Sequence, residues 1–283
     1  MNKMILTFVL GITFLMNAQI FSKKDIEICN SKFDYAVKNK LYEKPIGYII
    51  AEMGKSFIGT NYTAHTLEKG KTESLVVDFN GLDCTTFLET SLTLARCIKE
   101  RRTTFDNYQV ELKRIRYRNG IINQYPSRLH YFSDWIYDNI KKGIVENISQ
   151  KLGGKPIKFN VYYMSKNPAS YVQLNDNPSF IPDIEKQEKE INSREYYYIP
   201  KEKILQAEKE IQSGDLIAFT TDAKGLDISH VGIAIKMDDG IVHLMHAPNV
   251  GFKVQISPMS LADYIAKVKK DTGIIVLRAL EPK

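Results

Sequence analysis

The stretch 80–89 most constrains how this chain can fold, because an extended apolar run meets a helix there. Residues 74–79 lead into it as a strand, and apolar residues recur at helical spacing over residues 87–98. Asp83 is a good N-cap, so Cys84 is predicted to lie in the first turn of the helix. Unpaired N–H groups and the positive end of the helix dipole favour a thiolate there. Cys84 is therefore a candidate nucleophile, and the alternative is a small buried hydrophobic residue.

The length and composition suit a globular chain. Its 283 residues, of which 43% are hydrophobic, can bury one large core or two smaller ones. Charged residues make up 25%, which excludes a disordered chain and a membrane bundle. The net charge of +6 suits an anionic polymer such as a cell wall, but the chain has no concentrated basic run. Nucleic acid is therefore not an expected partner.

Residues 1–18 have the pattern of a secretory signal peptide. Lys3 supplies the positive start, residues 4–16 form the apolar core, and Ala18 is a small residue suited to cleavage. The apolar run is short for a membrane span, and no cysteine beside the cleavage site offers a lipid anchor. We therefore expect an exported protein, periplasmic or secreted, without a stable membrane anchor, whose residues 19–283 form a single domain.

The chain has three cysteines, and their odd number leaves at least one free thiol in an exported protein. Cys97 follows Cys84 by a step of about 220° round a continuous helix, so these two cannot pair with each other. A disulfide between Cys29 and Cys97 is the alternative that the sequence leaves undecided. The favoured interpretation of both is a packed thiol.

Two histidines are predicted to face each other across a β-hairpin. Residues 227–236 and 241–247 form its strands, joined by a three-residue turn with glycine in the left-handed position. In that register His246 is the diagonal neighbour of His230 on the same face, within reach of its side chain. His243 falls on the other face. A shift by one residue would reverse this preference.

Cys84, His230 and His246 together supply the groups that thiol catalysis needs. A nucleophilic cysteine requires a base to take its proton, and the base requires a polar group that holds its ring and tautomer. The three residues therefore indicate a thiol hydrolase or an acyl-transfer enzyme. A zinc site built from the same residues is the alternative, although the chain lacks the close paired spacing of zinc ligands.

The rest of the chain predicts an α+β fold with helices on one face of an antiparallel sheet. Helical spacing dominates the first half, and strands are expected in the second half, at residues 159–164 and 196–198 among others. Residues 185–190 are expected to form a solvated helix face. The aromatic stretch 116–131 suits either a site for a sugar or an acidic peptide, or a packed loop. His65 is expected to be a loop residue, with a ligand role left open.

These residues together resemble a known family. The chain is similar to the NlpC-type papain-like cysteine peptidases, which cut bacterial cell-wall peptides. It resembles more closely the N-acetylmuramoyl-L-alanine amidase-like family within that superfamily. The resemblance implies a papain-like fold, with a helical N-terminal half packed on an antiparallel sheet from the C-terminal half. The motifs that carry it are Gly54-Lys-Ser-Phe-Ile-Gly-Thr-Asn-Tyr62, Phe79-Asn-Gly-Leu-Asp-Cys-Thr-Thr-Phe87, Ser127-Arg-Leu-His-Tyr-Phe-Ser-Asp-Trp135, Gly214-Asp215 and Asp227-Ile-Ser-His-Val-Gly-Ile233.

The resemblance also implies an activity and a site. Cys84 would be the nucleophile, His230 the base and His246 the group that orients the base. The implied substrate is a peptidoglycan fragment of a bacterial wall, cut through an acyl-enzyme at the amide between the lactyl group of N-acetylmuramic acid and L-alanine. No metal or organic cofactor is implied. The residues implied to bind substrate are Tyr62, Asp83, Ser127, Arg128, His130 and Tyr131.

Two departures from the wider superfamily bear on specificity. Many endopeptidase relatives have Asp-Cys-Ser-Gly, where this chain has Asp83-Cys-Thr-Thr86. In those relatives the Ser-Gly pair helps to hold a free peptide amine, so its replacement fits an amidase better than a peptidase. His65 stands where a small residue is expected, which would narrow the pocket or change its specificity. The alternatives are a stem-peptide endopeptidase that uses the same three residues, and a cell-wall binding protein without catalysis.

Overall fold

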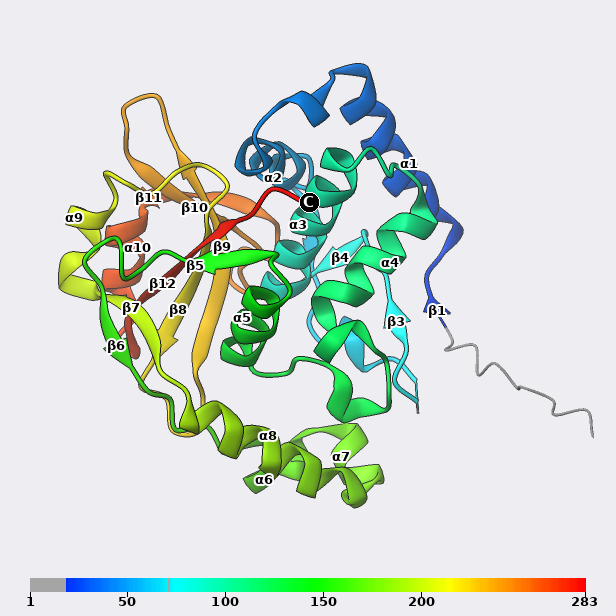
Figure 1. Cartoon of the computed structure of the whole chain (residues 1–283), viewed down its shortest axis with the longest axis vertical. Helices are drawn as coiled ribbons and strands as arrows, with labels where there is room; N and C mark the ends of the chain where they lie inside the picture. The colour runs from blue at the N-terminus through cyan, green and yellow to red at the C-terminus, as the bar shows by residue number, and fades with distance from the viewer. Residues whose placement is uncertain (1–18, 71) are drawn as a thin grey trace, which may run out of the picture.

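A computed structural model describes residues 19–70 and 72–283 of the chain (Figure 1). The expected signal peptide, residues 1–18, lies outside the described residues. The helices are α1 (Lys23–Lys38), α2 (Ile46–Lys55), α3 (Cys84–Lys99), α4 (Phe105–Arg116), α5 (Phe132–Lys141), α6 (Tyr163–Lys166), α7 (Val172–Asp176), α8 (Ile181–Ser193), α9 (Ile204–Ala207) and α10 (Leu261–Lys267). The strands are β1 (Gln19–Ile20), β2 (Asn61–Tyr62), β3 (Leu75–Val76), β4 (Gly81–Leu82), β5 (Val145–Asn147), β6 (Lys155–Ile157), β7 (Tyr196–Pro200), β8 (Leu216–Thr221), β9 (Ile228–Lys236), β10 (Val242–His246), β11 (Gln255–Ser260) and β12 (Asp271–Ala279).

One antiparallel sheet organises the second half of the chain. Its strands run in the order β11-β10-β9-β8-β12-β7-β6, and β5 pairs with β12 beside this path. Short parallel pairs, β1 with β3 and β2 with β4, lie in the helical first half. The α+β class predicted from the sequence is confirmed. Among the described residues, no helix has the length and apolar content that a bilayer crossing requires.

The sheet is buried on both faces, because its central strands carry apolar residues at successive positions. In β8, Leu216 and Ala218 join the core on the side of α2 and α3, whereas Ile217 and Phe219 join a second core. The short helices α9 and α10 cover this second core (Figure 1). The prediction that helices cover one face only is therefore wrong, since the opposite apolar face also needs a cover.

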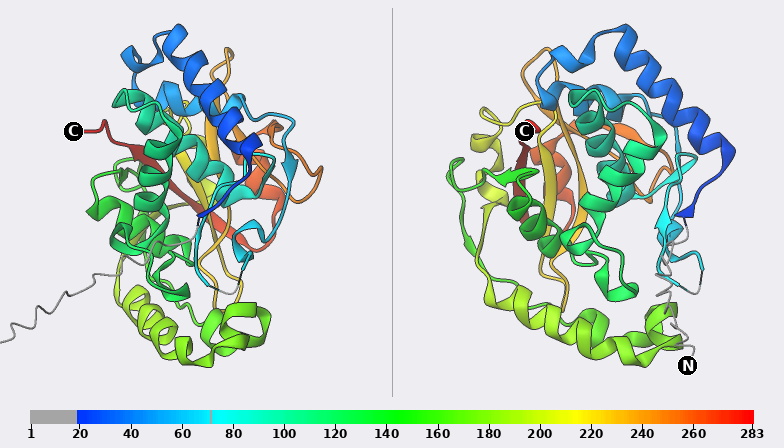
Figure 2. Two further views of the ribbon diagram at one scale, coloured as in Figure 1. Left: turned by 90° about the vertical axis from the view of Figure 1, so that its right-hand side faces the viewer. Right: turned by 45° about the vertical axis from the view of Figure 1, so that its right-hand side comes forward.

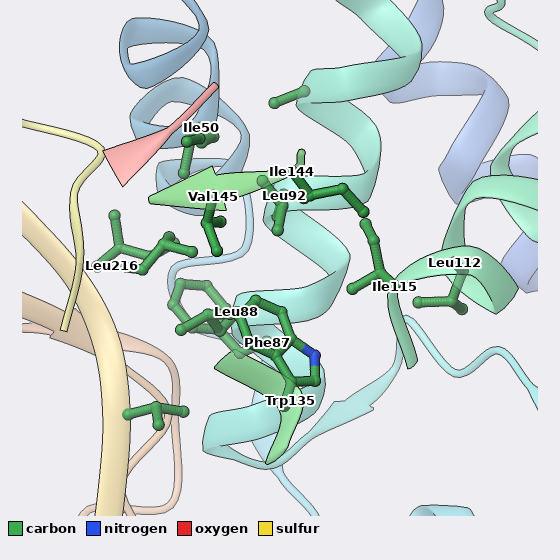
Figure 3. Packing of buried hydrophobic residues seen from close by; sticks show 14 of the residues in the cluster. Ile50, Phe87, Leu88, Leu92, Leu112, Ile115, Trp135, Ile144, Val145 and Leu216 are labelled. Atoms are coloured by element: carbon green, nitrogen blue, oxygen red, sulfur yellow. The ribbon is translucent and has the colours of Figure 1, made fainter. Parts of the chain in front are cut away.

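Helix α3 is the centre of the larger core. It lies between the sheet and α4, and each of residues 86–98 is buried. Figure 3 shows the side chains of Phe87, Leu88 and Leu92 packed among residues from the sheet and from α5, including Trp135. The helix is enclosed nearly all round although it also carries buried polar residues such as Glu89 and Arg96, and this burial determines where its first residue lies.

Two sequence predictions fail in the segment after the fifth helix. The strand expected over residues 159–164 is absent, because β6 ends before it and α6 begins at Tyr163. The solvated face expected over 185–190 is interrupted by Glu188, which is buried and accepts hydrogen bonds from the hydroxyl of Tyr131 (2.8 Å) and the backbone N–H of Ser165 (3.1 Å). These bonds fasten α6 and α8, which lie together beneath the rest of the fold in both views of Figure 2, to Tyr131 at the start of α5.

The packing of α3 predicts a large stability difference between two leucines. Leu92→Ala removes a fully buried side chain and should lower the free energy of unfolding by about 2–5 kcal/mol. Leu205→Ala in α9, where the leucine is 70% exposed, should change it by less than about 0.5 kcal/mol. Urea unfolding followed by circular dichroism measures both, and equal losses would contradict the central place of α3.

Candidate active site

Cys84 is the first residue of α3, as the sequence predicted. Asp83 caps the helix: its Oδ1 accepts hydrogen bonds from the backbone N–H of Thr86 (2.7 Å) and from the Thr86 hydroxyl (2.8 Å). The Thr86 hydroxyl in turn accepts from the Asp83 backbone N–H (2.9 Å). This reciprocal cap fixes the chain direction at the helix start, so the thiol is held by local hydrogen bonds as well as by the core.

Tyr62 lies in β2, the neighbour of the strand that leads to Cys84. It pairs with Leu82 in parallel register, and its backbone N–H donates to the carbonyl of Phe252 (2.7 Å). Burial raises the pKa of the Tyr62 hydroxyl, and the negative charges of the Cys84 thiolate and Asp83 raise it further. The Tyr62 phenol is thus an electrostatic neighbour of the thiol.

The β9–β10 hairpin has the predicted register, with His243 opposite Ile235. His230 Nε2 and His246 Nδ1 are 2.7 Å apart, and the two rings are nearly perpendicular. His243 points elsewhere and bonds the carbonyl of Ser257. Gly232 permits this approach, because a Cβ there would lie 2.8 Å from the Met245 carbonyl oxygen. The predicted preference for His246 over His243 is confirmed as geometry.

Cys84 and His230 line one cavity of about 320 Å³, reached from α3 on one side and from β9 on the other. Its walls combine aromatic and apolar side chains with buried charges. The lining residues are His65, Leu67, Glu68, Asp83, Cys84, Thr85, Glu89, Arg116, Tyr125, Arg128, Leu129, His130, Tyr131, Phe132, Met164, Tyr171, Leu226, Asp227, Ile228, Ser229, His230 and Val231. The volume is that of a pocket for a small ligand or part of a larger one.

Burial keeps both the thiol and the imidazoles neutral. It raises the pKa of Cys84 to about 11, with a further contribution from Asp83, although hydrogen bonds from the Val231 and Thr85 backbones oppose the shift. Burial lowers the pKa of His230 to about 4. It lowers that of His246 to about 3, with His230 adding to the effect. At neutral pH the site therefore holds a neutral thiol and neutral imidazoles, so a thiolate would form there only by proton transfer.

The contact between the two histidines determines which ring nitrogen of His230 is left without a partner in the pair. His230 Nε2 is occupied by His246, so His230 Nδ1 is the nitrogen left to act as a base. Nδ1 can accept a proton only if Nε2 carries the hydrogen and donates it to His246 Nδ1. The hydrogen bond between the rings thus couples the tautomers of the two side chains.

Arg128 and His130 lie in the cavity wall. Arg128 is buried, and its guanidinium contacts Glu68 (2.6 Å) and Glu73 (3.4 Å). Burial lowers the pKa of Arg128, but Glu73 and Glu68 outweigh this effect and the pKa ends above its ordinary value. His130 Nε2 bonds the carbonyl of Tyr125 (2.9 Å), and burial with the nearby Arg128 holds the pKa of His130 well below its ordinary value. Both side chains are fixed before any ligand arrives.

The remaining predicted contacts are divided between two places. Tyr131 lines the cavity, donates to Glu188 and accepts from the Met164 backbone N–H (3.0 Å). Ser127 instead faces a separate groove beside α8, and its hydroxyl donates to the Gln124 carbonyl (2.7 Å). The structure thus brings together Asp83, Arg128, His130 and Tyr131 around Cys84 and His230. Ser127 and Tyr62 are not among the residues that line this cavity. His65 lines the cavity in a left-handed conformation (φ 59°).

Comparison with known proteins identifies the family of this chain. A sequence model described as AmiA-like, N-acetylmuramoyl-L-alanine amidase-like, matches residues 52–274. The chain belongs to this family. No curated protein sequence matches this amidase-like chain at a significant level. Within the described residues, no group of three or more His, Cys, Asp or Glu side chains is arranged to hold a metal ion.

Solved structures place the amidase-like chain among similar folds. An N-acetylmuramoyl-L-alanine amidase from Bacteroides uniformis is 34% identical, with a TM-score of 0.79 over 83% of this chain and 99% of the other. A Bacteroides fragilis protein described as a xylanase is 38% identical, with a TM-score of 0.75 over 80% and 99% of the two chains. A Legionella pneumophila protein, 22% identical with a TM-score of 0.69 over 92% and 97%, shares the fold.

Several wall residues of this amidase-like protein escaped the sequence reasoning. Met164 and Tyr171 enter the cavity from the segment 163–193, for which the sequence predicted a strand ending at residue 164 and a solvated helix face at 185–190. Asp227 is buried in the wall and accepts from the Ser133 backbone N–H (2.7 Å). Its position three residues before His230 was the available signal for Asp227. Met164 and Tyr171 had no such local signal.

The electrostatics predict a slow thiol at neutral pH. Alkylation of Cys84 by iodoacetamide should accelerate as the pH rises towards about 11, because only the thiolate reacts. Asp83→Asn keeps a helix cap but removes the negative charge, so it should lower the pH at which alkylation accelerates. Intact-protein mass spectrometry follows the adduct.

Cys84→Ala is the control for this measurement, since Cys29 and Cys97 are buried and have raised pKa values. It should leave the protein without adduct. A rate that is already maximal at neutral pH would contradict the neutral resting pair and indicate a preformed thiolate–imidazolium pair.

Proposed function

We propose that this protein is a thiol-dependent hydrolase that cleaves the amide between N-acetylmuramic acid and L-alanine in peptidoglycan fragments. The observation that carries the proposal is a cysteine at a helix start that shares a cavity with a histidine bonded to a second histidine. Family membership and the name of the 34%-identical solved relative support the choice of substrate. We further propose a papain-like fold of the NlpC-type superfamily, formed by residues 19–283 as one domain.

The first half of the mechanism is attack on the amide carbonyl. His230 Nδ1 takes the proton of the Cys84 thiol while the sulfur forms a bond to the carbonyl carbon. The carbonyl oxygen becomes an oxyanion. The Cys84 backbone N–H at the start of α3 has no partner among the described residues and is a candidate donor to it, with the Tyr62 hydroxyl as a second candidate.

The second half of the mechanism releases two products. The proton on His230 Nδ1 passes to the amide nitrogen, the carbon–nitrogen bond breaks, and the stem peptide leaves with L-alanine at its amino end. The lactyl group stays on Cys84 as a thioester. Water loses a proton to His230 Nδ1 and attacks the thioester carbon. The carbon–sulfur bond then breaks, the proton passes from His230 to the sulfur, and N-acetylmuramic acid leaves with a free lactyl carboxyl group. Throughout, His246 Nδ1 accepts the hydrogen bond from His230 Nε2 and stabilises the charge that develops on that ring.

The helix cap favours the amidase over the endopeptidase alternative. In endopeptidase relatives the two residues after the cysteine help to hold a free peptide amine. Here the Thr86 hydroxyl donates to the Asp83 side chain and accepts from the Asp83 backbone N–H, so the helix cap already uses its donor and one of its two acceptor positions. The endopeptidase remains the second candidate, because it would use the same nucleophile and base.

A glycosidase is not proposed, although one similar structure is described as a xylanase. Retaining and inverting glycosidases need two carboxyl groups free to act on either side of the sugar bond. The cavity carboxylates are already bound: Glu68 to Arg128, Glu89 to Arg116, Asp83 to Thr86 and Asp227 to the Ser133 backbone. We propose an exported enzyme, periplasmic or secreted. Its positive net charge, which is +6 for the full chain including Lys3, suits an anionic wall polymer.

The proposed activity predicts a defined pair of products. Incubation with defined muropeptides should release an intact stem peptide beginning with L-alanine, as measured by mass spectrometry. Cys84→Ala should lower the rate at least about 10³-fold, because the nucleophile is lost. A cut after D-glutamate would assign the endopeptidase instead. If the wild-type protein bound muropeptides without cleaving them, the result would support the alternative of a cell-wall binding protein without catalysis.

The orienting role of His246 predicts a graded series. His246→Ala should lower kcat about 10²- to 10⁴-fold with little change in KM, because the base loses the group that fixes its tautomer. His246→Asn supplies a carbonyl acceptor and should retain more activity than alanine. Equal activity of the alanine variant and the wild type would remove His246 from the mechanism.

A further inference from the structure

His246 leaves one question of proton placement open. The base function of His230 requires that His246 Nδ1 accept a hydrogen bond, so the hydrogen of His246 must sit on Nε2. His246 is 1% exposed, and its Nε2 atom is buried without a hydrogen-bond partner among the described residues. The opposite tautomer would leave a bare lone pair at the same buried atom and reverse the hydrogen bond between the rings. Something else must therefore favour the productive tautomer.

Tyr264 is a second aromatic neighbour of His246, besides His230. It belongs to α10, and its ring centroid is 5.1 Å from that of His246, at an interplanar angle of 86°. An aromatic face carries partial negative charge, so it attracts an N–H and repels a lone pair. Perpendicular packing at this distance is the arrangement in which an N–H can point into a ring.

The position of Tyr264 is itself fixed by packing. Its ring lies 5.8 Å from that of Phe219, which in turn lies 5.7 Å from the ring of His230, its partner across β8 and β9. Ser260 caps α10 by accepting from the Asp263 backbone N–H (3.0 Å). The four rings thus form one cluster on the face of the sheet that α10 covers.

We propose that Tyr264 is a positioning residue, whose ring face receives the Nε2–H of His246 and thereby holds both histidines in the tautomers that make His230 Nδ1 a base. Tyr264 acts through His246 and touches no substrate. The inference rests on the proposed thiol chemistry for its effect on rate, but the tautomer itself is a property of the free protein.

Two substitutions separate the ring from the hydroxyl. Tyr264→Phe keeps the ring face and should leave kcat within about 2-fold of the wild type. Tyr264→Leu removes the face and should lower kcat roughly 10-fold or more, with KM changed less than about 2-fold, because a smaller fraction of the protein holds the productive tautomer. A phenylalanine variant as impaired as the leucine variant would overturn the proposal.

Nuclear magnetic resonance gives a readout independent of activity. Long-range ¹H–¹⁵N spectra of protein labelled at histidine, assigned with His246→Asn, report which ring nitrogen of His246 carries hydrogen. The wild type and Tyr264→Phe should show the hydrogen on Nε2, and Tyr264→Leu should shift it towards Nδ1. An unchanged Nε2–H tautomer in Tyr264→Leu would overturn the proposal.

A third variant covers the case in which Tyr264→Leu does not fold. Tyr264→pentafluorophenylalanine keeps the ring shape but reverses the charge of its face, so it should destabilise the Nε2–H tautomer and lower kcat relative to Tyr264→Phe. Spectra identical to those of Tyr264→Phe would overturn the proposal. If the proposed function were wrong but the role of Tyr264 right, muropeptides would stay uncut while the histidine tautomers of the free protein still followed the predicted series.

Discussion

The burial of α3 is the constraint on which the rest of the structure depends. Each residue from Thr86 to Ile98 is enclosed, between the sheet and the neighbouring helices. A closely packed helix cannot turn or slide without opening voids in the core. Its first residue, Cys84, is thereby held in the cavity that β9 also lines, through residues such as Val231. The position of the thiol is therefore a property of the core rather than of a flexible loop.

Buried charges connect this core to the cavity. Glu89 of α3 bonds Arg116 of α4 (2.7 Å) and the indole N–H of Trp135 of α5 (3.1 Å), so it holds α4 and α5 against α3. Glu89 and Arg116 also line the cavity. Removing one partner of a buried ion pair costs about 3–5 kcal/mol, because the other charge is left uncompensated. The network thus serves the stability of the fold and the electrostatics of the cavity wall together.

The sequence predicted those features that depend on short-range rules. The start of α3 follows from the Asp83 cap, and the register of the histidine hairpin follows from its three-residue turn. The failures depend on contacts between distant residues. Glu188 is buried because it meets Tyr131, 57 positions away, and no local pattern indicates that meeting. Ser127 adjoins Arg128 in sequence, yet the two side chains face different hollows, because neighbours in an irregular segment need not point the same way.

The segment 163–193 contributes to the cavity wall but carries none of the proposed catalytic groups. This segment supplies Met164 and Tyr171 to the cavity wall and is fastened through Glu188, whereas the thiol and the imidazoles come from α3 and the sheet. Substitutions in the segment can reshape the wall while leaving the bond-breaking groups in place. The ligand preference of the cavity can therefore evolve independently of the groups proposed for the chemical step.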